Sequence, residues 1–174
     1  MSGGPFASQS ARGFPDMHIK LLWVGKTKNT QIKSLASDYL ARIRCMVPCS
    51  LVETRDLTKR SSLRGAELIA REGAELAKHL PEGGRLVALD EKGIQFTSPD
   101  FARWLELEQN SGARVITFVI GGPEGLSREI SERAHVVLSL GKMTWTHEIC
   151  RLLLLEQVYR ALCIMRRIPY HKGA

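Results

Sequence analysis

The chain has 174 residues, 44% of them hydrophobic and 25% charged, which is the composition of an ordinary globular protein. This length is enough for a single domain with a substantial core, and no apolar run reaches the roughly eighteen uncharged residues that a membrane-spanning helix requires. The formal net charge of +7 indicates a polyanionic partner, with nucleic acid as the first candidate and a merely basic soluble protein as the alternative.

The four cysteines do not form a disulfide or metal-binding pattern. Cys150 and Cys163 lie within an apolar segment, and the sequence has no Cys-x-x-Cys pair. The spacing of Cys45 and Cys49 is only a faint indication of metal ligands. We therefore expect reduced thiols in a cytoplasmic protein that binds no metal.

Residues 1–16 are rich in Gly, Ser, Ala and Pro and have no hydrophobic periodicity. We expect a disordered extension or a remnant of cloning, followed by a single domain over residues 17–174. The segment lacks the basic start and the apolar core of a secretory signal.

The first half of the domain alternates between short apolar runs and longer amphipathic ones. It is predicted to form strand, helix, strand and helix over residues 18–25, 31–44, 50–54 and about 63–80. Gly25 ends the first strand in a turn, and Pro48 separates the first helix from the second strand.

The second half continues the alternation and ends in an apolar helix. Its predicted strands and helices cover residues 85–90, 97–111, 115–120, 127–133, 135–140 and 146–165. Glu91-Lys92-Gly93 is expected to close the third strand, and Pro99 marks the start of the following helix. The regular order of strands and helices predicts an α/β fold with a parallel sheet.

Two loops at strand ends form the candidate ligand site. The apolar run 115–120 stops at Gly121-Gly122-Pro123-Glu124-Gly125, and the last strand is followed by residues 141–144. Glycine lets the backbone adopt positive φ and approach a ligand closely. In open parallel sheets, ligands bind beyond the carboxyl ends of the strands, which is where both loops fall.

Several common catalytic motifs are missing from the sequence. It has no Gly-x-x-x-x-Gly-Lys-Ser/Thr, no Gly-x-Gly-x-x-Gly and no Gly-x-Ser-x-Gly. The five histidines have no metal-ligand spacing. What remains is a glycine-lined pocket in a basic α/β domain, which suits an uncharged or zwitterionic cofactor held by main-chain groups.

Six motifs in register carry a resemblance to a known family. They are Leu89-Asp90-Glu91-x-Gly93, Ile120-Gly121-Gly122-Pro123-Glu124-Gly125-Leu126, Leu138-Ser139-Leu140-x-Lys142-Met143-Thr144, His147, Glu156-Gln157-Val158-Tyr159-Arg160-Ala161 and Pro169-Tyr170-His171. With these motifs, the chain from about Met17 to Lys172 resembles the RlmH (YbeA-like) family of SPOUT methyltransferases. One departure is Thr146-His147-Glu148, where many members have Pro-His-Pro or Asn-His-Gln, and it leaves the start of the last helix open.

The resemblance implies a trefoil-knotted α/β fold, in which the carboxyl-terminal part threads through a loop, and a homodimer. The apolar character of the last helix independently favours a dimer, since its leucines exceed what one helix face can bury. A buried core helix in a monomer is the alternative.

The resemblance also implies S-adenosylmethionine (SAM) as the cofactor, bound in the knot loops. The residues implied to bind it are Leu89, Gly121, Gly122, Leu140, Gly141, Lys142, Met143, Thr144 and Trp145. Backbone groups of these loops would recognise the adenine edge, and the apolar side chains would pack around it.

The implied reaction is methylation at N3 of a pseudouridine in the helix 69 loop of 23S rRNA, with the assembled 70S ribosome favoured as substrate. This chemistry requires that the N3 proton be accepted while the nitrogen is aligned with the methyl group. His171 is the candidate acceptor, and Tyr170 would orient or stack the base, with the tail folded over the pocket of its own or of the partner subunit. Alternatively, both residues only contact the RNA backbone.

Five basic residues near the end of the chain are candidate contacts for RNA phosphates: Arg151, Arg160, Arg166, Arg167 and Lys172. His147 is expected to start the last helix or to pack, and Glu124 to stabilise its loop. Two other functions remain open at this point. They are a SPOUT enzyme that acts on tRNA or a ribose 2′-oxygen, and a ribosome assembly factor without catalytic activity.

Overall fold

The computed structural model describes residues 17–59 and 63–172, apart from the side chains of residues 59, 171 and 172. The segment 1–16, predicted to be an extension, lies outside the described residues. The strands are β1 (His18–Val24), β2 (Cys49–Thr54), β3 (Arg85–Ile94), β4 (Val115–Ile120) and β5 (Val136–Leu138). The helices are α1 (Thr30–Arg44), α2 (Gly65–Ala77), α3 (Ser98–Asn110), α4 (Arg128–Arg133) and α5 (His147–Met165), with short 3₁₀ helices η1 (Leu57–Lys59) and η2 (Pro169–Lys172).

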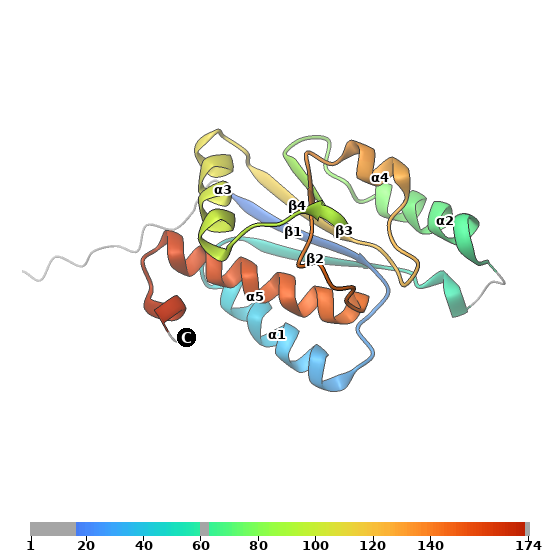
Figure 1. Ribbon diagram of the computed structural model, residues 1–174, viewed down its shortest axis with the longest axis horizontal. Coiled ribbons are helices and arrows are strands. Elements are labelled where there is room, and N and C mark those ends of the chain that lie inside the picture. Colours follow the sequence, from blue (N-terminus) through green and yellow to red (C-terminus); the bar gives the residue numbers. More distant parts are fainter. Residues whose placement is uncertain (1–16, 60–62, 173–174) are drawn as a thin grey trace, which may run out of the picture.

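The five strands form one sheet in the order β2-β1-β4-β3-β5, and all its pairings are parallel. Parallel neighbours need crossover connections, and the helices between the strands supply them. The α/β fold with a parallel sheet, predicted from the alternation of strands and helices, is confirmed (Figure 1).

Helices cover both faces of the sheet, and each face has its own core. On one side, α1, α3 and α5 pack together over a large cluster that includes Trp23, Phe101, Phe118 and Val158. On the other side, α2 and α4 cover a smaller cluster around Leu22. Burial on both faces explains why the strands are continuous apolar runs instead of alternating ones.

Side-chain caps fix where four helices begin. Asn29, Thr97, Ser127 and Thr146 precede α1, α3, α4 and α5, and each accepts a hydrogen bond from the backbone N–H three residues ahead. Such caps satisfy one of the free N–H groups of the first turn. Thr146 thus starts α5 at the position that the family resemblance left open.

Three elements differ from the sequence predictions by two or more residues at one end or both. β3 continues through Glu91-Lys92-Gly93 to Ile94, with an irregular register against Leu138, and the Ile94 carbonyl accepts the Ser139 N–H at 2.8 Å. Gly93 permits this because a Cβ there would lie under 3.0 Å from the backbone of Val137. α2 and β5 are shorter at both ends than predicted. Among the described residues, no helix is long and apolar enough to cross a membrane.

Candidate functional site

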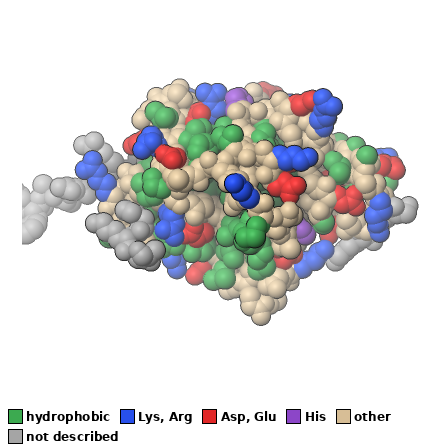
Figure 2. Space-filling view, in the orientation of Figure 1, with side chains coloured by type: hydrophobic (Ala, Val, Ile, Leu, Met, Phe, Trp, Pro, Cys, Tyr) green, Lys and Arg blue, Asp and Glu red, His purple; other side chains and the backbone are tan. Residues whose placement is uncertain are grey.

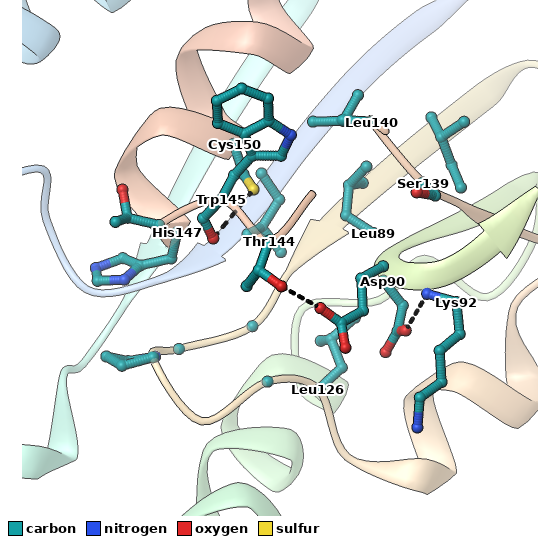
Figure 3. Close-up of a pocket in the computed structure, with 18 of the residues that line it drawn as sticks. Leu89, Asp90, Lys92, Leu126, Ser139, Leu140, Thr144, Trp145, His147 and Cys150 are labelled. Carbon is teal, nitrogen blue, oxygen red and sulfur yellow. Dashed lines mark hydrogen bonds between the residues drawn. The ribbon is translucent and has the colours of Figure 1, made fainter. Parts of the chain in front are cut away.

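A cavity of about 560 Å³ lies at the carboxyl ends of β4 and β5, beside the second half of β3. Its walls are residues 89–92 of β3, the loops that follow β4 and β5, and the first turn of α5, as Figure 3 shows for Leu89, Leu126, Leu140 and His147. The size falls within the range of sites for small molecules and cofactors. The two loops predicted to form a ligand site thus meet in one cavity, joined by the irregular end of β3.

The loop after β4 is folded tightly on itself. A Cβ on Gly121 would lie under 3.0 Å from the backbone of Gly125 and Leu126, so the two ends of the loop can meet only when residue 121 is glycine. Gly125 has φ +98°, and its N–H donates to the Gly122 carbonyl at 3.0 Å. Glycine is required for close approach at the first position and for its positive φ at the second.

The loop after β5 is shaped by its own hydrogen bonds and by one bond to β3. The Ser139 hydroxyl donates to the Gly141 carbonyl at 2.8 Å, and Gly141 has φ +143°. Further along, the Thr144 hydroxyl donates to Glu91 at 2.8 Å (Figure 3). This bond links the loop after β5 to β3.

The cavity has a mixed lining with an acidic side. Three carboxylates line it, from Asp90, Glu91 and Glu124, against one lysine, Lys92. Burial, together with the nearby Arg151 guanidinium, lowers the pKa of His147, so its imidazole is neutral at pH 7. The chain has a net charge of +7, but the cavity itself is rich in carboxylates. Such a cavity favours a cationic group over a phosphate.

The rim of the cavity is apolar. Met143 and Trp145 are 70% and 41% exposed, although large apolar side chains are usually buried. In Figure 2, hydrophobic side chains gather at the centre of the face, over the loop that leads into α5, with basic and acidic side chains beside them. Stacking surfaces beside polar groups are typical of sites that bind adenine or another base.

The amino-terminal end of α5 is anchored to the start of α1. Glu148 accepts hydrogen bonds from the backbone N–H groups of Lys28 and Asn29, at 2.8 and 3.1 Å. Arg151 is fully buried; it donates to the Val24 carbonyl at 2.5 Å and to the Thr27 hydroxyl at 3.0 Å. This burial contradicts the prediction that Arg151 contacts RNA phosphates, because its guanidinium instead holds the end of β1 against α5.

The predicted catalytic tail lies at the other end of α5. The Tyr170 hydroxyl is 3.1 Å from that of Tyr39 and 3.3 Å from the Glu156 carboxylate, and its ring meets Tyr159 edge-on at 4.8 Å. Burial and the bond to Tyr39 raise the pKa of Tyr170, so its hydroxyl stays protonated at neutral pH. The 19 residues of α5 span about 28 Å, so this tail does not meet the cavity of its own chain (Figure 1).

The other predicted phosphate contacts also lie near this end of α5. Arg160 pairs with Glu156 at 2.6 Å, and its guanidinium stands 5.1 Å from the centroid of the Tyr170 ring. Arg166 donates to the Met46 carbonyl, and Arg167 is exposed with φ +57°. The side chains of His171 and Lys172 lie outside the described residues, so their predicted roles stay predictions.

The cofactor residues predicted by resemblance converge on the cavity, with one exception. Leu89, Gly121, Gly122, Leu140, Gly141, Met143, Thr144 and Trp145 all line it. Lys142 belongs to the same loop but is exposed and does not line the cavity. Whether these residues bind a cofactor stays a prediction.

Two contributors were missed from the sequence. Glu91 was interpreted as the end of a strand and as part of a family motif, but its hydrogen bond to Thr144 was not predicted. Glu72, on α2, is buried behind the glycine loop, and only the glycine that follows it in an otherwise ordinary helix could have indicated a close contact. Within the described part of the chain, no group of His, Cys, Asp and Glu side chains could hold a metal ion, and the four cysteines are free.

Comparison with known proteins identifies the family. The model described as "Predicted SPOUT methyltransferase" matches residues 17–171. Proteins called Ribosomal RNA large subunit methyltransferase H, from Citrifermentans bemidjiense and Geotalea daltonii, are 39% and 40% identical to the chain. Each alignment covers 89% of this chain and 99% of the relative.

Solved structures agree at the level of the fold. A probable methyltransferase from Bordetella pertussis is 14% identical, with a TM-score of 0.52 over 86% of this chain and 95% of that one. A methylase family protein from Neisseria gonorrhoeae is also 14% identical, with a TM-score of 0.50 over 84% and 82% of the two chains. The family match over most of its length and relatives near 40% identity establish that this chain belongs to the SPOUT methyltransferase family.

Proposed function

We propose that this protein is a SAM-dependent methyltransferase of the large-subunit ribosomal RNA, which methylates N3 of a pseudouridine in the helix 69 loop of 23S rRNA. The observation that carries the proposal is the convergence of loops from β3, β4 and β5 on one cavity, in a chain about 40% identical to enzymes called Ribosomal RNA large subunit methyltransferase H. The net charge of +7 supports an RNA substrate.

The cavity fits SAM in size and in charge. SAM carries a positive sulfonium, which supplies an electrophilic methyl group when the cofactor is bound. The carboxylates of Asp90, Glu91 and Glu124 on the cavity wall provide a favourable field for a sulfonium and an amino group. Leu89 and Leu140 offer apolar contacts for an adenine ring, and the glycine loop leaves backbone groups accessible to its polar edge.

We infer a homodimer in which the tail of one subunit completes the cavity of the other. The separation of tail and cavity along α5 supports this, because the tail of a chain cannot reach the cavity of the same chain. Leu152 and Leu153 on α5 stay partly exposed in the single chain and would be covered by a partner. The resulting site would have residues of both chains.

The trefoil knot implied by the family belongs to the same proposal. β5 pairs with β3 and not with the preceding β4, so the chain crosses β3 on the face of α4 and then returns to the opposite face as α5. This crossing and return supports a knot, in which the loops after β4 and β5 would be held rigidly against each other. Rigid loops would present the bound cofactor without reordering.

Methyl transfer to N3 requires that the protein align the base with the methyl group and provide one proton acceptor. N3 of the base must point at the methyl group while its imino proton leaves. His171 of the tail is proposed to accept this proton, with Tyr170 against the base. The Tyr170 hydroxyl is neutral and lies beside Arg160, which places a cation near any negative charge that develops on the base.

The basic residues after the middle of α5 are proposed to bind RNA phosphates. Arg160, Arg166, Arg167 and Lys172 remain in this proposal, whereas the buried Arg151 does not. A 19.4 kDa chain has little surface with which to recognise the shape of a large RNA. We therefore propose that the substrate is the assembled 70S ribosome in the cytoplasm, which presents helix 69 in one fixed orientation.

Transfer of a labelled methyl group from SAM tests this function. Unmethylated 70S ribosomes, isolated 50S subunits and naked rRNA are supplied in parallel, and the modified nucleotide is located by mass spectrometry. We expect label at N3 of the helix 69 pseudouridine, with 70S as the best substrate. Label that appears only on tRNA or on ribose would refute the proposed target, and a protein that binds ribosomes without transferring a methyl group would be an assembly factor.

A further inference from the structure

A buried carboxylate lies behind the glycine loop, outside the cavity. Glu72 on α2 is 2% exposed, and neither of its carboxylate oxygens has a hydrogen-bond partner of good geometry among the described residues, although the backbone N–H of Leu57 lies close enough to favour its anion. A buried acid in this state is rare, because burial of an unpaired polar group costs free energy. A specific role is the usual reason for such a group to persist.

The position of Glu72 is tied to the loop by the adjacent glycines. A Cβ on Gly122 would lie under 3.0 Å from the carboxylate of Glu72, so this carboxylate touches the loop backbone from behind. A Cβ on Gly73, the next residue of α2, would lie under 3.0 Å from the Ser127 hydroxyl at the far end of the loop. Two successive residues of α2 thus fit against the two ends of segment 122–127, whose other side faces the cavity.

The electrostatic surroundings of Glu72 oppose its ionisation. Burial is the largest effect, and it raises the pKa of Glu72 to about 7, assisted by the negative charges of Asp56 from the β2–η1 loop and Glu124 from the glycine loop. The backbone N–H of Leu57 acts in the opposite direction. Among the described cations, Lys28 is paired with Asp56 at 2.9 Å.

We propose that Glu72 is a positioning residue that supports the glycine loop in its cofactor-binding shape while it is uncharged, and that its ionisation disturbs this loop. The acid form fills the space beneath Gly122 and can donate a hydrogen bond to the loop backbone. The anion would bring a third negative charge next to Asp56 and Glu124 and would seek water. The inference rests on the proposed binding of SAM in this cavity.

The consequence is a cofactor affinity that falls as the pH rises. Glu72 is neutral below its pKa and ionised above it, so the supported form of the loop is lost as the pH passes through about 7. If SAM binds only when Glu72 is neutral, its dissociation constant would rise by about 10- to 30-fold between pH 6 and pH 8.5. Helix residues exposed to solvent, such as Glu67, would have no such effect.

The test measures SAM binding by calorimetry at several pH values for wild type, Glu72→Gln and Glu67→Gln. Glutamine has the shape of the neutral acid and cannot ionise. We expect Glu72→Gln to bind SAM with the acid-pH affinity of wild type at every pH, and Glu67→Gln to follow wild type. The ratio of wild-type to Glu72→Gln dissociation constants also cancels the titration of the α-amino group of SAM itself, which has a pKa of about 8.

A second pair of variants tests contact between the two residues. Gly122 has an ordinary φ, so Gly122→Ala is opposed by the Glu72 side chain and not by the backbone. We expect Gly122→Ala to weaken SAM binding about tenfold in the wild-type background and less than about threefold in the Glu72→Ala background. This rescue would not occur if Glu72 stabilised α2 alone.

The outcomes separate this inference from the proposed function. Equal pH profiles of wild type and Glu72→Gln, or additive effects of Gly122→Ala and Glu72→Ala, would overturn the role of Glu72 while SAM binding by the wild type stands. A wild-type protein that binds no SAM at any pH would overturn the proposed cofactor site, and the role of Glu72 with it.

Discussion

The two ends of α5 are built for different tasks. At its amino-terminal end, Glu148 binds the start of α1 and Arg151 binds the end of β1. The cavity beside them is lined by carboxylates and by tight backbone loops. At its carboxyl-terminal end, tyrosines and arginines from α1, α5 and η2 form a cluster. In the proposed function, the first end encloses a small cationic ligand, and the second presents aromatic and basic groups to a nucleic acid.

This division teaches that a net charge does not locate a binding site. The chain carries +7, yet the cavity between the strand ends and α5 has three carboxylates and one lysine. The arginines proposed to bind RNA lie elsewhere, near the tail. In the proposed dimer, the two ends of α5 meet across the interface, and the predictions below test whether their tasks are as separate as the geometry indicates.

The largest effect is expected for the tail. His171→Ala should lower the turnover of methyl transfer to ribosomes by about 10²- to 10⁴-fold, because it removes the proposed proton acceptor. SAM binding should be unchanged, since the proposed cofactor residues all belong to the cavity and none to the tail. Single-turnover kinetics and calorimetry measure the two quantities. Full turnover by this variant would eliminate the proposed role of His171.

The reverse pattern is expected for the glycine loop. Gly121→Ala places a Cβ against the backbone of Gly125, which cannot move aside as a side chain could. We expect SAM binding to weaken by about 30-fold or more, equivalent to about 2 kcal/mol, while ribosome binding stays within about twofold. Filter binding with labelled ribosomes provides the second measurement. Gly83→Ala, at a position with open space around it, is the matched control.

A smaller effect is expected for the basic residues near the tail. Arg167→Ala removes an exposed cation and should weaken ribosome binding by about three- to tenfold at physiological salt, with a shallower dependence on salt concentration. SAM affinity should not change. Arg133→Ala, which removes an exposed arginine on the opposite face of the sheet, serves as control. An equal loss for both variants would show that binding responds to net charge alone.

The last effect concerns stability instead of binding or turnover. The pKa of Glu72 is higher in the folded protein than in an unfolded chain, so the folded state holds a proton that the unfolded state releases. The free energy of unfolding should therefore fall as the pH rises from about 4.5 to 7, and Glu72→Gln should remove this loss, by roughly 1–2 kcal/mol at pH 8. Urea titrations of both proteins at pH 5 and pH 8 measure it. A Glu72→Gln protein that gains nothing at pH 8 would contradict the assignment.

Much of the fold and the cavity could be predicted from the sequence, because these features are local. Continuous apolar runs predicted the buried strands, and glycines at their ends predicted the loops that meet in the cavity. The predicted end of β3 was wrong, because a glycine can either end a strand or allow close approach of two backbones. Gly93 was interpreted as a stop, whereas the structure uses it for close approach to Val137.

The errors and omissions at the site come from long-range contacts. Arg151 was predicted to face RNA because a helix that is apolar nearly all round does not reveal where its polar residues point, and the carbonyl that binds Arg151 lies 127 residues earlier. Glu72 belongs to a helix rich in exposed charges, and only the fold brings it beneath Gly122. The family resemblance predicted the cofactor loops, but it could not reveal that Glu72 lies behind one of them.

In the proposed dimer, each site joins the cavity of one chain to the tail of the other, and mixing two inactive variants measures whether the site is shared. Gly121→Ala has a damaged cavity and an intact tail, and His171→Ala has the reverse. After subunit exchange at equal amounts, half of the dimers are mixed, and each mixed dimer has one site with an intact cavity and an intact tail.

We therefore predict that methyl transfer to 70S ribosomes recovers to about one quarter of the wild-type rate, as random pairing of two chains requires. Mass spectrometry of differently tagged chains confirms that mixed dimers have formed. Mixed dimers that are no more active than either variant alone would contradict the shared site and place cavity and tail in the same chain.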